Sequence, residues 1–496
     1  MDLLTAEERR IEVVPAARRW PAFAGLAIYI SVAAAAIAHH EPWADEAQSW
    51  LLARDVGIQE LWTRLLHYEG TTGLWQTLLH LLIRAGLPYA GMNVVAGVLG
   101  AAAAGLILWR APFPWSVRLA LPFTYFLCYQ YAVIARSYDL LPVLVFACAA
   151  WFEQAAERPL PFTSLLCLMA AVSVHGMILA VSIGVAAMAQ CRERKRLLPW
   201  AGGFAAVVAL LAAAAWPAAD GTFITRLNFS FEHFVEVCGK AFAAAFTGET
   251  SSSLVIVALS IPLLWRGGGL LFFAVASGLL CGVYAIVYSQ VWHFGVLFLA
   301  WIFALWIAYR ECGDRSAPQS MLNRWQRQSK WHCALMRAAS PSSRLALAAL
   351  AVVIVVQCYW ALCAVRYDWG EAYSASPAAA RELREPGLAH HRVYAIGFAC
   401  VAIQPYFPRN IFSNWSTAYW DWSRQNHINL DTLRLAETRP DYVIVGYKND
   451  FERGVWTEQV RNSGYQAIRH FEGNSFWHAQ VYEPESFDLY RLGSGR

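Results

Sequence analysis

The sequence predicts a polytopic α-helical membrane protein with a small α/β domain in its C-terminal part. Its 496 residues are 58% hydrophobic and 15% charged, whereas about a quarter of the residues in a typical soluble protein are charged. Apolar runs such as 345–365 are long enough to cross the hydrocarbon core of a bilayer. After residue 365 the apolar runs shorten to the length of strands. These three observations predict a membrane domain over 1–365 and a separate domain over 366–496.

Eleven membrane spans are expected in the first domain. The run 20–38 is apolar and has no small-residue cleavage site before His39, so it is interpreted as an anchor and not as a signal peptide. The other ten spans are expected near 89–109, 118–134, 138–153, 160–175, 176–190, 199–217, 252–265, 269–288, 293–309 and 344–365.

The distribution of basic residues predicts the orientation of these spans. Lys and Arg near spans mark the cytoplasmic side. With eleven spans, the N-terminal arginines, the cluster at 192–196 and the basic linker 310–342 all fall in the cytoplasm. The acidic segments 39–88 and 218–250 then fall outside, as does the C-terminus. We therefore expect a multi-pass protein of a plasma membrane, namely the bacterial inner membrane.

The first outer loop, 39–88, is expected to carry amphipathic helices. Between Glu46 and His67 the apolar residues recur at spacings of three and four, with a break at Gly57. Tryptophans on such helices favour the membrane–water interface. The loop should therefore lie along the outer surface.

The C-terminal region alternates two patterns. Strand-like runs occupy 393–398, 442–447 and 480–482, and helical patterns occupy 377–385 and 452–463. This alternation predicts a small α/β domain on the outer surface.

Acidic residues of the first outer loop are candidates for chemistry. Asp45 and Glu46 stand at the start of an interfacial helix, where Asp45 suits a general base and equally a helix N-cap. Glu69 precedes another apolar segment, and here the alternative is an ordinary polar break between helices.

Basic residues and histidines fall on the same side. Arg136 and Tyr138 lie between two predicted spans, where an arginine runs against the positive-inside preference and its planar guanidinium suits phosphate. The alternative is an arginine that pairs with Asp139 or extends toward the interface. His175 and His293 lie at outer ends of spans, and for both the alternative is a hydrogen-bonded core histidine. Ionisable residues near membrane depth indicate a functional site, so we expect one shared site.

Several short motifs resemble the first outer loop of GT-C-type glycosyltransferases, which include protein O-mannosyltransferases and the aminoarabinose transferases of lipid A. The motifs are Asp45-Glu46-Ala47, Leu51-Leu52-Ala53-Arg54, Glu60-Leu61-Trp62, Tyr68-Glu69-Gly70 and Leu78-Leu79-His80-Leu81. Arg136-Ser137-Tyr138 and His175 also resemble an Arg–Tyr pair and an outer histidine of that family. The resemblance covers roughly residues 20–190. Many relatives have His-Pro or Pro-Pro after the loop glycine, but Thr71-Thr72 follows Gly70 here.

The resemblance implies an inverting transferase that takes a sugar from a polyprenyl phosphate to a lipid, glycan or protein acceptor. Asp45, with Glu46 beside it, would be the catalytic carboxylate pair. Arg136, Tyr138 and His175 would hold the donor phosphate. Glu69 and His293 would contact substrate. The sequence shows no dedicated set of metal ligands. Whether Glu46 or Glu69 binds a divalent metal therefore stays an open question. Membrane lipids are expected partners, and nucleic acid is not.

Three other functions stay open at this point. A transporter or flippase of lipid-linked sugars would predict internal repeats or broken helices in matching halves, and the sequence shows neither. A polymerase or ligase of surface polysaccharide would share the lipid donor but would place its key residues in a large late loop. A non-catalytic membrane scaffold would make the outer charges incidental.

Overall fold

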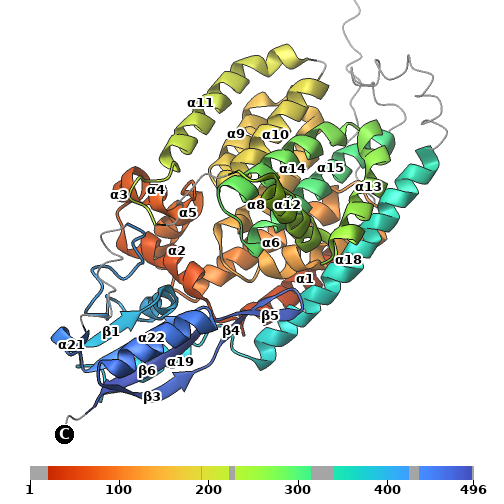
Figure 1. Ribbon diagram of the computed structural model, residues 1–496. Coiled ribbons are helices and arrows are strands. Elements are labelled where there is room, and N and C mark those ends of the chain that lie inside the picture. The colour runs from red at the N-terminus through yellow and green to blue at the C-terminus, as the bar shows by residue number, and fades with distance from the viewer. Residues whose placement is uncertain (1–19, 192, 223–228, 314–338, 424–434, 494–496) are drawn as a thin grey trace, which may run out of the picture.

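The computed structural model describes residues 20–191, 193–222, 229–313, 339–423 and 435–493. Figure 1 shows a helical bundle with a smaller, sheet-containing C-terminal domain at one end. The N-terminal arginines and most of the predicted linker 310–342 lie outside the described residues.

The bundle is built from helices of very different lengths. Local signals set several of their starts: Pro159 and Pro199 stand in the first turns of two helices, where a missing N–H costs nothing. Ser173 caps another by accepting a hydrogen bond from the Gly176 N–H at 3.1 Å. The helices are α1 (Trp20–Ile37), α6 (Gly91–Arg110), α7 (Trp115–Ala120), α8 (Leu140–Trp151), α9 (Pro159–Ala170), α10 (Val174–Gln190), α11 (Leu198–Ala214), α12 (Phe231–Phe246), α13 (Thr250–Arg266), α14 (Gly269–Ile286), α15 (Gly295–Gly313) and α18 (Ala339–Gly370).

Fewer helices than expected have the length of a membrane span. Within the described ranges, five are long and apolar enough to cross a membrane, namely α1, α6, α14, Val291–Arg310 and Ser343–Gly370. The pair α12 and α13 bends by 74° and adds a sixth if it counts as one span. Helices α9, α10 and α11 are apolar but shorter. The prediction of eleven full-length spans is therefore wrong, whereas the apolar helices agree with a membrane protein.

The path of the backbone explains much of this difference. The expected span 118–134 is broken into the end of α7, a tight turn at Leu121–Phe123 and a π-helical turn at Phe126–Gln130. Pro122 lies in the break and has no N–H to continue a helix. In the expected span 138–153 the helix α8 covers 12 residues, and 3₁₀ turns at Ser137–Asp139 and Phe152–Gln154 flank it. Apolar composition thus marks these segments as buried without fixing how many of them cross the bilayer.

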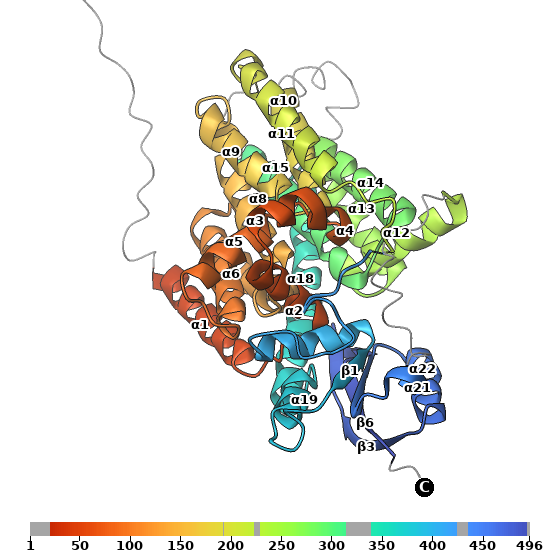
Figure 2. The same ribbon diagram turned by 90° about the vertical axis from the view of Figure 1, so that its left-hand side faces the viewer.

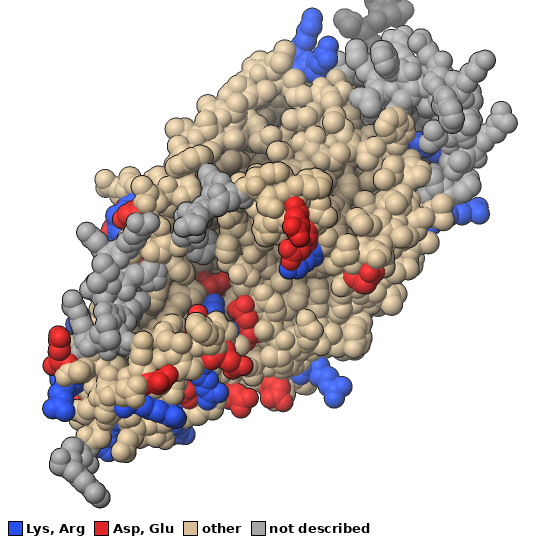
Figure 3. Space-filling model, viewed as in Figure 1, with Lys and Arg blue, Asp and Glu red and all other residues tan. Residues whose placement is uncertain are grey.

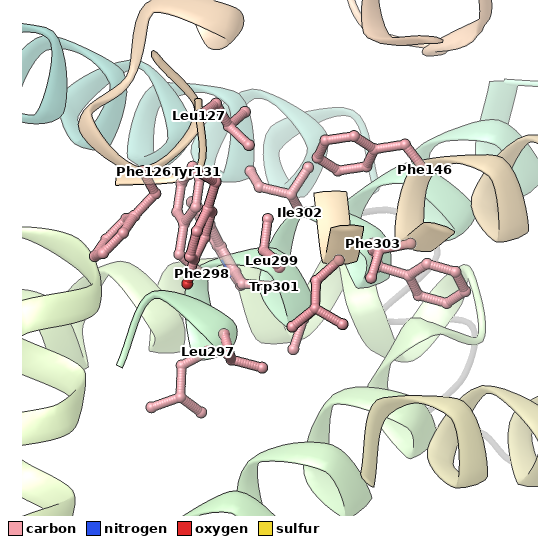
Figure 4. Close-up of a cluster of buried hydrophobic side chains, with 14 of the residues drawn as sticks. Phe126, Leu127, Tyr131, Phe146, Leu297, Phe298, Leu299, Trp301, Ile302 and Phe303 are labelled. Carbon is pink, nitrogen blue, oxygen red and sulfur yellow. The ribbon is translucent and has the colours of Figure 1, made fainter. Parts of the chain in front are cut away.

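Helix α15 is the centre of the bundle. It is apolar on all sides and almost wholly buried, as expected of a helix surrounded by other helices. Figure 4 shows Phe298, Trp301 and Phe303 of α15 among the side chains of neighbouring segments, including Phe126 and Phe146. On the outside of the bundle, by contrast, apolar side chains such as Leu210 and Val355 are 72% and 69% exposed, as expected where lipid replaces water.

The C-terminal domain contains a four-stranded sheet with the order β1-β2-β6-β3. Strands β1 and β2 are parallel, and the other neighbours are antiparallel. The strands are β1 (Val393–Ile396), β2 (Tyr442–Tyr447), β3 (Tyr465–Phe471) and β6 (Ser486–Leu492), with a separate hairpin of β4 (Asn474–Trp477) and β5 (Gln480–Pro484). The helical elements are α19 (Ser376–Leu383), the 3₁₀ segment η9 (Phe398–Tyr406), α21 (Leu435–Thr438) and α22 (Asp450–Asn462). The predicted combination of strands and helices is therefore present.

Short helices and the β4–β5 hairpin join the two parts. The helices are α2 (Ala44–Asp55), α3 (Ile58–Glu60), α4 (Leu66–Glu69) and α5 (Leu74–Arg84). Figures 1 and 2 both place α2 between the bundle and the C-terminal domain, where it packs against η9. At the tip of the hairpin, the His478 ring stacks on the Trp360 ring of α18 with the centroids 3.7 Å apart. The domain is thus anchored to the bundle on two sides.

Candidate functional site

A cavity of about 1340 Å³ lies where the first loop, the bundle and the C-terminal domain meet. In Figure 3 charged side chains gather over the C-terminal domain and this junction, while most of the bundle surface that faces the viewer is uncharged. Most of the predicted site residues line this one cavity: Asp45, Glu69, Arg136, Tyr138, His175 and His293. Residues from distant segments of the sequence thus share one cavity.

Asp45 forms the centre of the polar part of the cavity. Its Oδ2 lies 3.0 Å from Arg136 Nη2, and its Oδ1 lies 3.8 Å from Lys448 Nζ. The side chain is 18% exposed, so the ion pair is partly hydrated. The N-cap position of α2 belongs to Trp43, so Asp45 does not have the capping role that the sequence left open. Two cations thus flank a carboxylate that a ligand in the cavity can reach.

Arg136 is held by aromatic rings. Its guanidinium carbon lies 5.4 Å from the ring centroid of Trp292 and 5.6 Å from that of Trp43, at distances where cation–π attraction operates. Asp139 accepts a hydrogen bond from the backbone N–H of Arg136 at 2.9 Å, and the guanidinium itself pairs with Asp45. Its Nη1 is buried and has no hydrogen-bond acceptor among the described residues. A buried N–H of a charged group needs a partner, so this atom is suited to an anionic ligand.

Two histidines and Tyr138 form the wall beside Arg136. The Tyr138 hydroxyl lies 3.2 Å from His175 Nδ1, and the rings of His175 and His293 have centroids 4.8 Å apart. His293 Nδ1 accepts the backbone N–H of Gln290 at 3.2 Å. His175 Nε2 is buried without a hydrogen-bond partner in the described part of the chain. The cavity therefore contains a second buried nitrogen that a ligand can satisfy.

Glu69 differs from Asp45 in its surroundings. Its Oε1 accepts a hydrogen bond from Gln48 Nε2 at 2.8 Å. Burial raises the pKa of Glu69 to about 8, although the hydrogen bond from Gln48 lowers it and the charge of Asp45 raises it further. At neutral pH Glu69 is therefore mostly protonated and can donate a hydrogen bond to a ligand.

Glu46 lies outside this cavity, which corrects the expectation that it forms a catalytic pair with Asp45. Its side chain is fully buried and accepts hydrogen bonds from the Ala135 N–H at 2.7 Å and from Asn93 Nδ2 at 2.8 Å. The Trp43 N–H is a third donor at 3.2 Å. Successive residues of a helix point about 100° apart, so adjacent carboxylates face different surroundings. Glu46 holds the start of α2 against the segment that carries Arg136.

A buried ionic network continues behind Glu46. His40 Nε2 lies 3.0 Å from Glu46, and His40 Nδ1 lies 3.2 Å from Asp368 of α18. The Tyr129 hydroxyl donates to Asp368 at 2.9 Å. Burial lowers the pKa of His40, but the charges of Glu46 and Asp368 outweigh burial and raise it to about 10. His40 is therefore a cation at neutral pH, and the network ties α1, α2 and α18 together.

The C-terminal domain contributes residues that sequence reasoning missed. Lys448 reaches Asp45 and lies 4.6 Å from the centroid of the Trp43 ring. Tyr482 and Glu483 of the β4–β5 hairpin also line the cavity. A signal was present, since the polar residues 448–450 directly follow the strand-like run 442–447, and ligands in α/β domains bind beyond the carboxyl ends of strands.

No set of metal ligands is evident. Among the described residues, no group of three or more His, Cys, Asp or Glu side chains is arranged to hold a metal ion. The sequence named two candidate ligands. The carboxylate of Glu46 accepts hydrogen bonds from the Ala135 N–H and from Asn93, and that of Glu69 accepts one from Gln48.

Comparison with known proteins does not identify a family. No family model matches the chain, and no curated protein or solved structure is significantly similar to it. The function must therefore be argued from the geometry of the cavity.

Proposed function

We propose that this protein is an inverting glycosyltransferase that moves a sugar from a polyprenyl-phosphate donor to an acceptor at the outer face of a membrane. One observation carries the proposal: a carboxylate, Asp45, is paired with Arg136 inside a large cavity, and Arg136 still has a buried N–H without a partner among the described residues. A base and a phosphate-binding cation side by side are what this reaction needs.

The reaction is a single displacement. Asp45 takes the proton of the acceptor hydroxyl, and the acceptor oxygen forms a bond to the anomeric carbon of the sugar. The bond from that carbon to the phosphate oxygen breaks, and its electron pair leaves with the phosphate, which inverts the anomeric centre. Arg136 Nη1 and His175 Nε2 supply hydrogen bonds to the departing phosphate. Phosphate is a good leaving group, so no strong general acid is required.

The other walls of the cavity suit the rest of the donor. Met177 of α10, Ala212 of α11 and Val283 of α14 form an apolar side, which suits the isoprenoid units next to the phosphate. The protonated carboxyl of Glu69 can donate to a sugar hydroxyl. The outer location is part of the proposal, and its support is the preference of basic residues near apolar runs for the cytoplasmic side.

The proposal is tested by the lipid-linked sugars of cells that lack the protein. We expect a polyprenyl-phosphate sugar to accumulate in the outer leaflet, and wild-type protein to clear it. The Asp45→Asn protein, present in the membrane at the same level as wild type, should leave the lipid-linked sugar in place. The control Asp55→Asn changes a residue on the same helix that does not line the cavity, and this protein should remove the lipid-linked sugar as wild type does. Unchanged lipid-linked sugars would contradict the proposal. Accumulation confined to the inner leaflet would indicate a flippase instead.

A further inference from the structure

We infer that the C-terminal domain forms the acceptor subsite of the cavity and that the acceptor it takes is a carbohydrate. The acceptor role rests on the proposed function. The carbohydrate site itself rests on the residues of the domain and can be tested without any transfer reaction.

The first argument is the place of this wall in the sheet. Residues 397–399 follow β1 and residues 448–450 follow β2, and both segments line the cavity. Strands β1 and β2 are parallel neighbours, so their carboxyl ends lie side by side, where α/β sheets bind ligands. Gly397 has a φ of +94°, and a Cβ there would lie 2.0 Å from the Gly446 carbonyl oxygen. The turn therefore requires glycine, and it delivers Phe398 to the cavity.

The second argument is the chemistry of the wall. Phe398, Trp420 and Trp422 form one aromatic cluster that lines the cavity, with ring centroids 5.0 to 6.0 Å apart. Lys448 Nζ lies 4.8 Å from the centroid of the Phe398 ring, and Glu483 lines the same cavity. A pyranose has apolar C–H faces that pack on aromatic rings and hydroxyls that bond to charged groups at the rim. A lipid chain would instead need an apolar groove without such charges.

The third argument is the position of this wall relative to Asp45. Asp45 lies between Arg136 on the bundle side and Lys448 on the side of the C-terminal domain. An inverting displacement brings the acceptor hydroxyl in opposite the leaving phosphate. With the phosphate at Arg136, the acceptor approaches from the wall that carries Lys448 and the aromatic cluster.

The cluster is also held in place before any ligand binds. Gln48 of α2 donates to the Trp420 carbonyl and accepts its N–H, both at 2.8 Å. The Trp422 carbonyl accepts the Thr222 N–H and hydroxyl, both at 2.9 Å. Because Gln48 lies one helical turn after Asp45, the rings are fixed relative to the catalytic carboxylate. Ligand sites are usually preformed in this way.

The experiment measures glycan binding by the full-length, detergent-solubilised protein on an array of diverse immobilised glycans, without donor. We expect a set of related glycans to bind. Trp422→Ala and Glu483→Gln should each weaken this binding by about tenfold or more. The control Phe451→Ala, an exposed aromatic of the same domain that does not line the cavity, should leave binding unchanged. If the Trp422→Ala protein does not fold, glycan binding by the Glu483→Gln protein decides whether the subsite is correct.

The outcomes separate this inference from the proposed function. If no glycan binds although cells lacking the protein accumulate the lipid-linked donor, the carbohydrate subsite is wrong and the transferase stands. Equal binding by wild type, Trp422→Ala and Glu483→Gln would also overturn the subsite. Binding that depends on Trp422, without donor accumulation in those cells, would support a carbohydrate site but not the transfer.

Discussion

The two sides of α2 carry similar charges in opposite surroundings. On the cavity side, Asp45 pairs with Arg136 at 3.0 Å, both side chains are nearly a fifth exposed, and Arg136 retains an unpartnered N–H among the described residues. On the other side, Glu46 lies 3.0 Å from His40, both side chains are fully buried, and Glu46 accepts three further hydrogen bonds. The two sides differ in unused donor capacity and in access to ligand, and not in the presence of an ion pair.

The largest effect on stability is expected when the buried side is broken. Glu46→Ala removes the carboxylate that accepts from the Ala135 N–H and from Asn93 and that pairs with the His40 cation, which then retains only Asp368. The free energy of unfolding should therefore fall by about 3–5 kcal/mol. Thermal unfolding of the purified protein measures this, with Asp55→Ala as a control on the exposed end of the same helix. A melting temperature equal to that of the Asp55→Ala control would contradict the structural role assigned to Glu46.

The charge of His40 on the buried side of α2 makes the stability of the protein depend on pH. His40 has a folded pKa of about 10, above its ordinary 6.5, so its contribution to stability is complete below about pH 6.5 and is lost as the pH rises through 10. The wild-type melting temperature should therefore fall between these values more than that of His40→Gln. Parallel pH profiles for the two proteins would contradict the charged state of His40.

On the cavity side, Arg136→Ala should chiefly impair use of the donor. Loss of a group that stabilises the leaving phosphate lowers kcat/KM by about 10²–10³-fold, while loss of a partly exposed ion pair changes stability by only about 1 kcal/mol or less. Transfer kinetics at varied donor concentration, together with thermal unfolding, measure both effects. Unchanged dependence on the donor would show that the phosphate lies elsewhere.

Glu69 offers a smaller, pH-dependent test. Its folded pKa of about 8 lies above its ordinary 4.5, so the neutral form predominates below pH 8 and is lost above it. If the protonated carboxyl donates to substrate, wild-type kcat/KM should decline above pH 8, and Glu69→Gln, which keeps a donor but cannot ionise, should not show this decline. An identical decline in both proteins would assign the titration to another group.

Lys448→Met should have the smallest effect. Lys448 Nζ is 3.8 Å from Asp45 and its side chain is 21% exposed, so the interaction is worth about 1 kcal/mol or less. We expect a loss in kcat/KM of about fivefold or less, with no change in melting temperature. A loss as large as that of Arg136→Ala would make Lys448 a primary phosphate ligand.

Part of this site was predictable from the sequence. The distribution of charged residues near apolar runs predicted one shared site for Asp45, Glu69, Arg136, His175 and His293. In the structure these residues line one cavity. The shared cavity agrees with this grouping, whereas the side of the membrane on which the residues lie stays a prediction.

Other features depend on contacts between distant segments. The opposite roles of Asp45 and Glu46 follow from how α2 is rotated against residues 133–136, which no local pattern encodes. The place of Lys448 depends on how the C-terminal domain docks through η9 and the β4–β5 hairpin. The number of spans was overestimated because hydropathy records apolar content and not the breaks at residues such as Pro122.

The most direct test of the account is transfer by purified Asp45→Asn with the native polyprenyl-phosphate sugar. Removing a general base should lower the rate of transfer by about 10²–10⁴-fold, with donor binding and melting temperature retained. A transfer rate equal to that of wild type would contradict the central claim that Asp45 activates the acceptor.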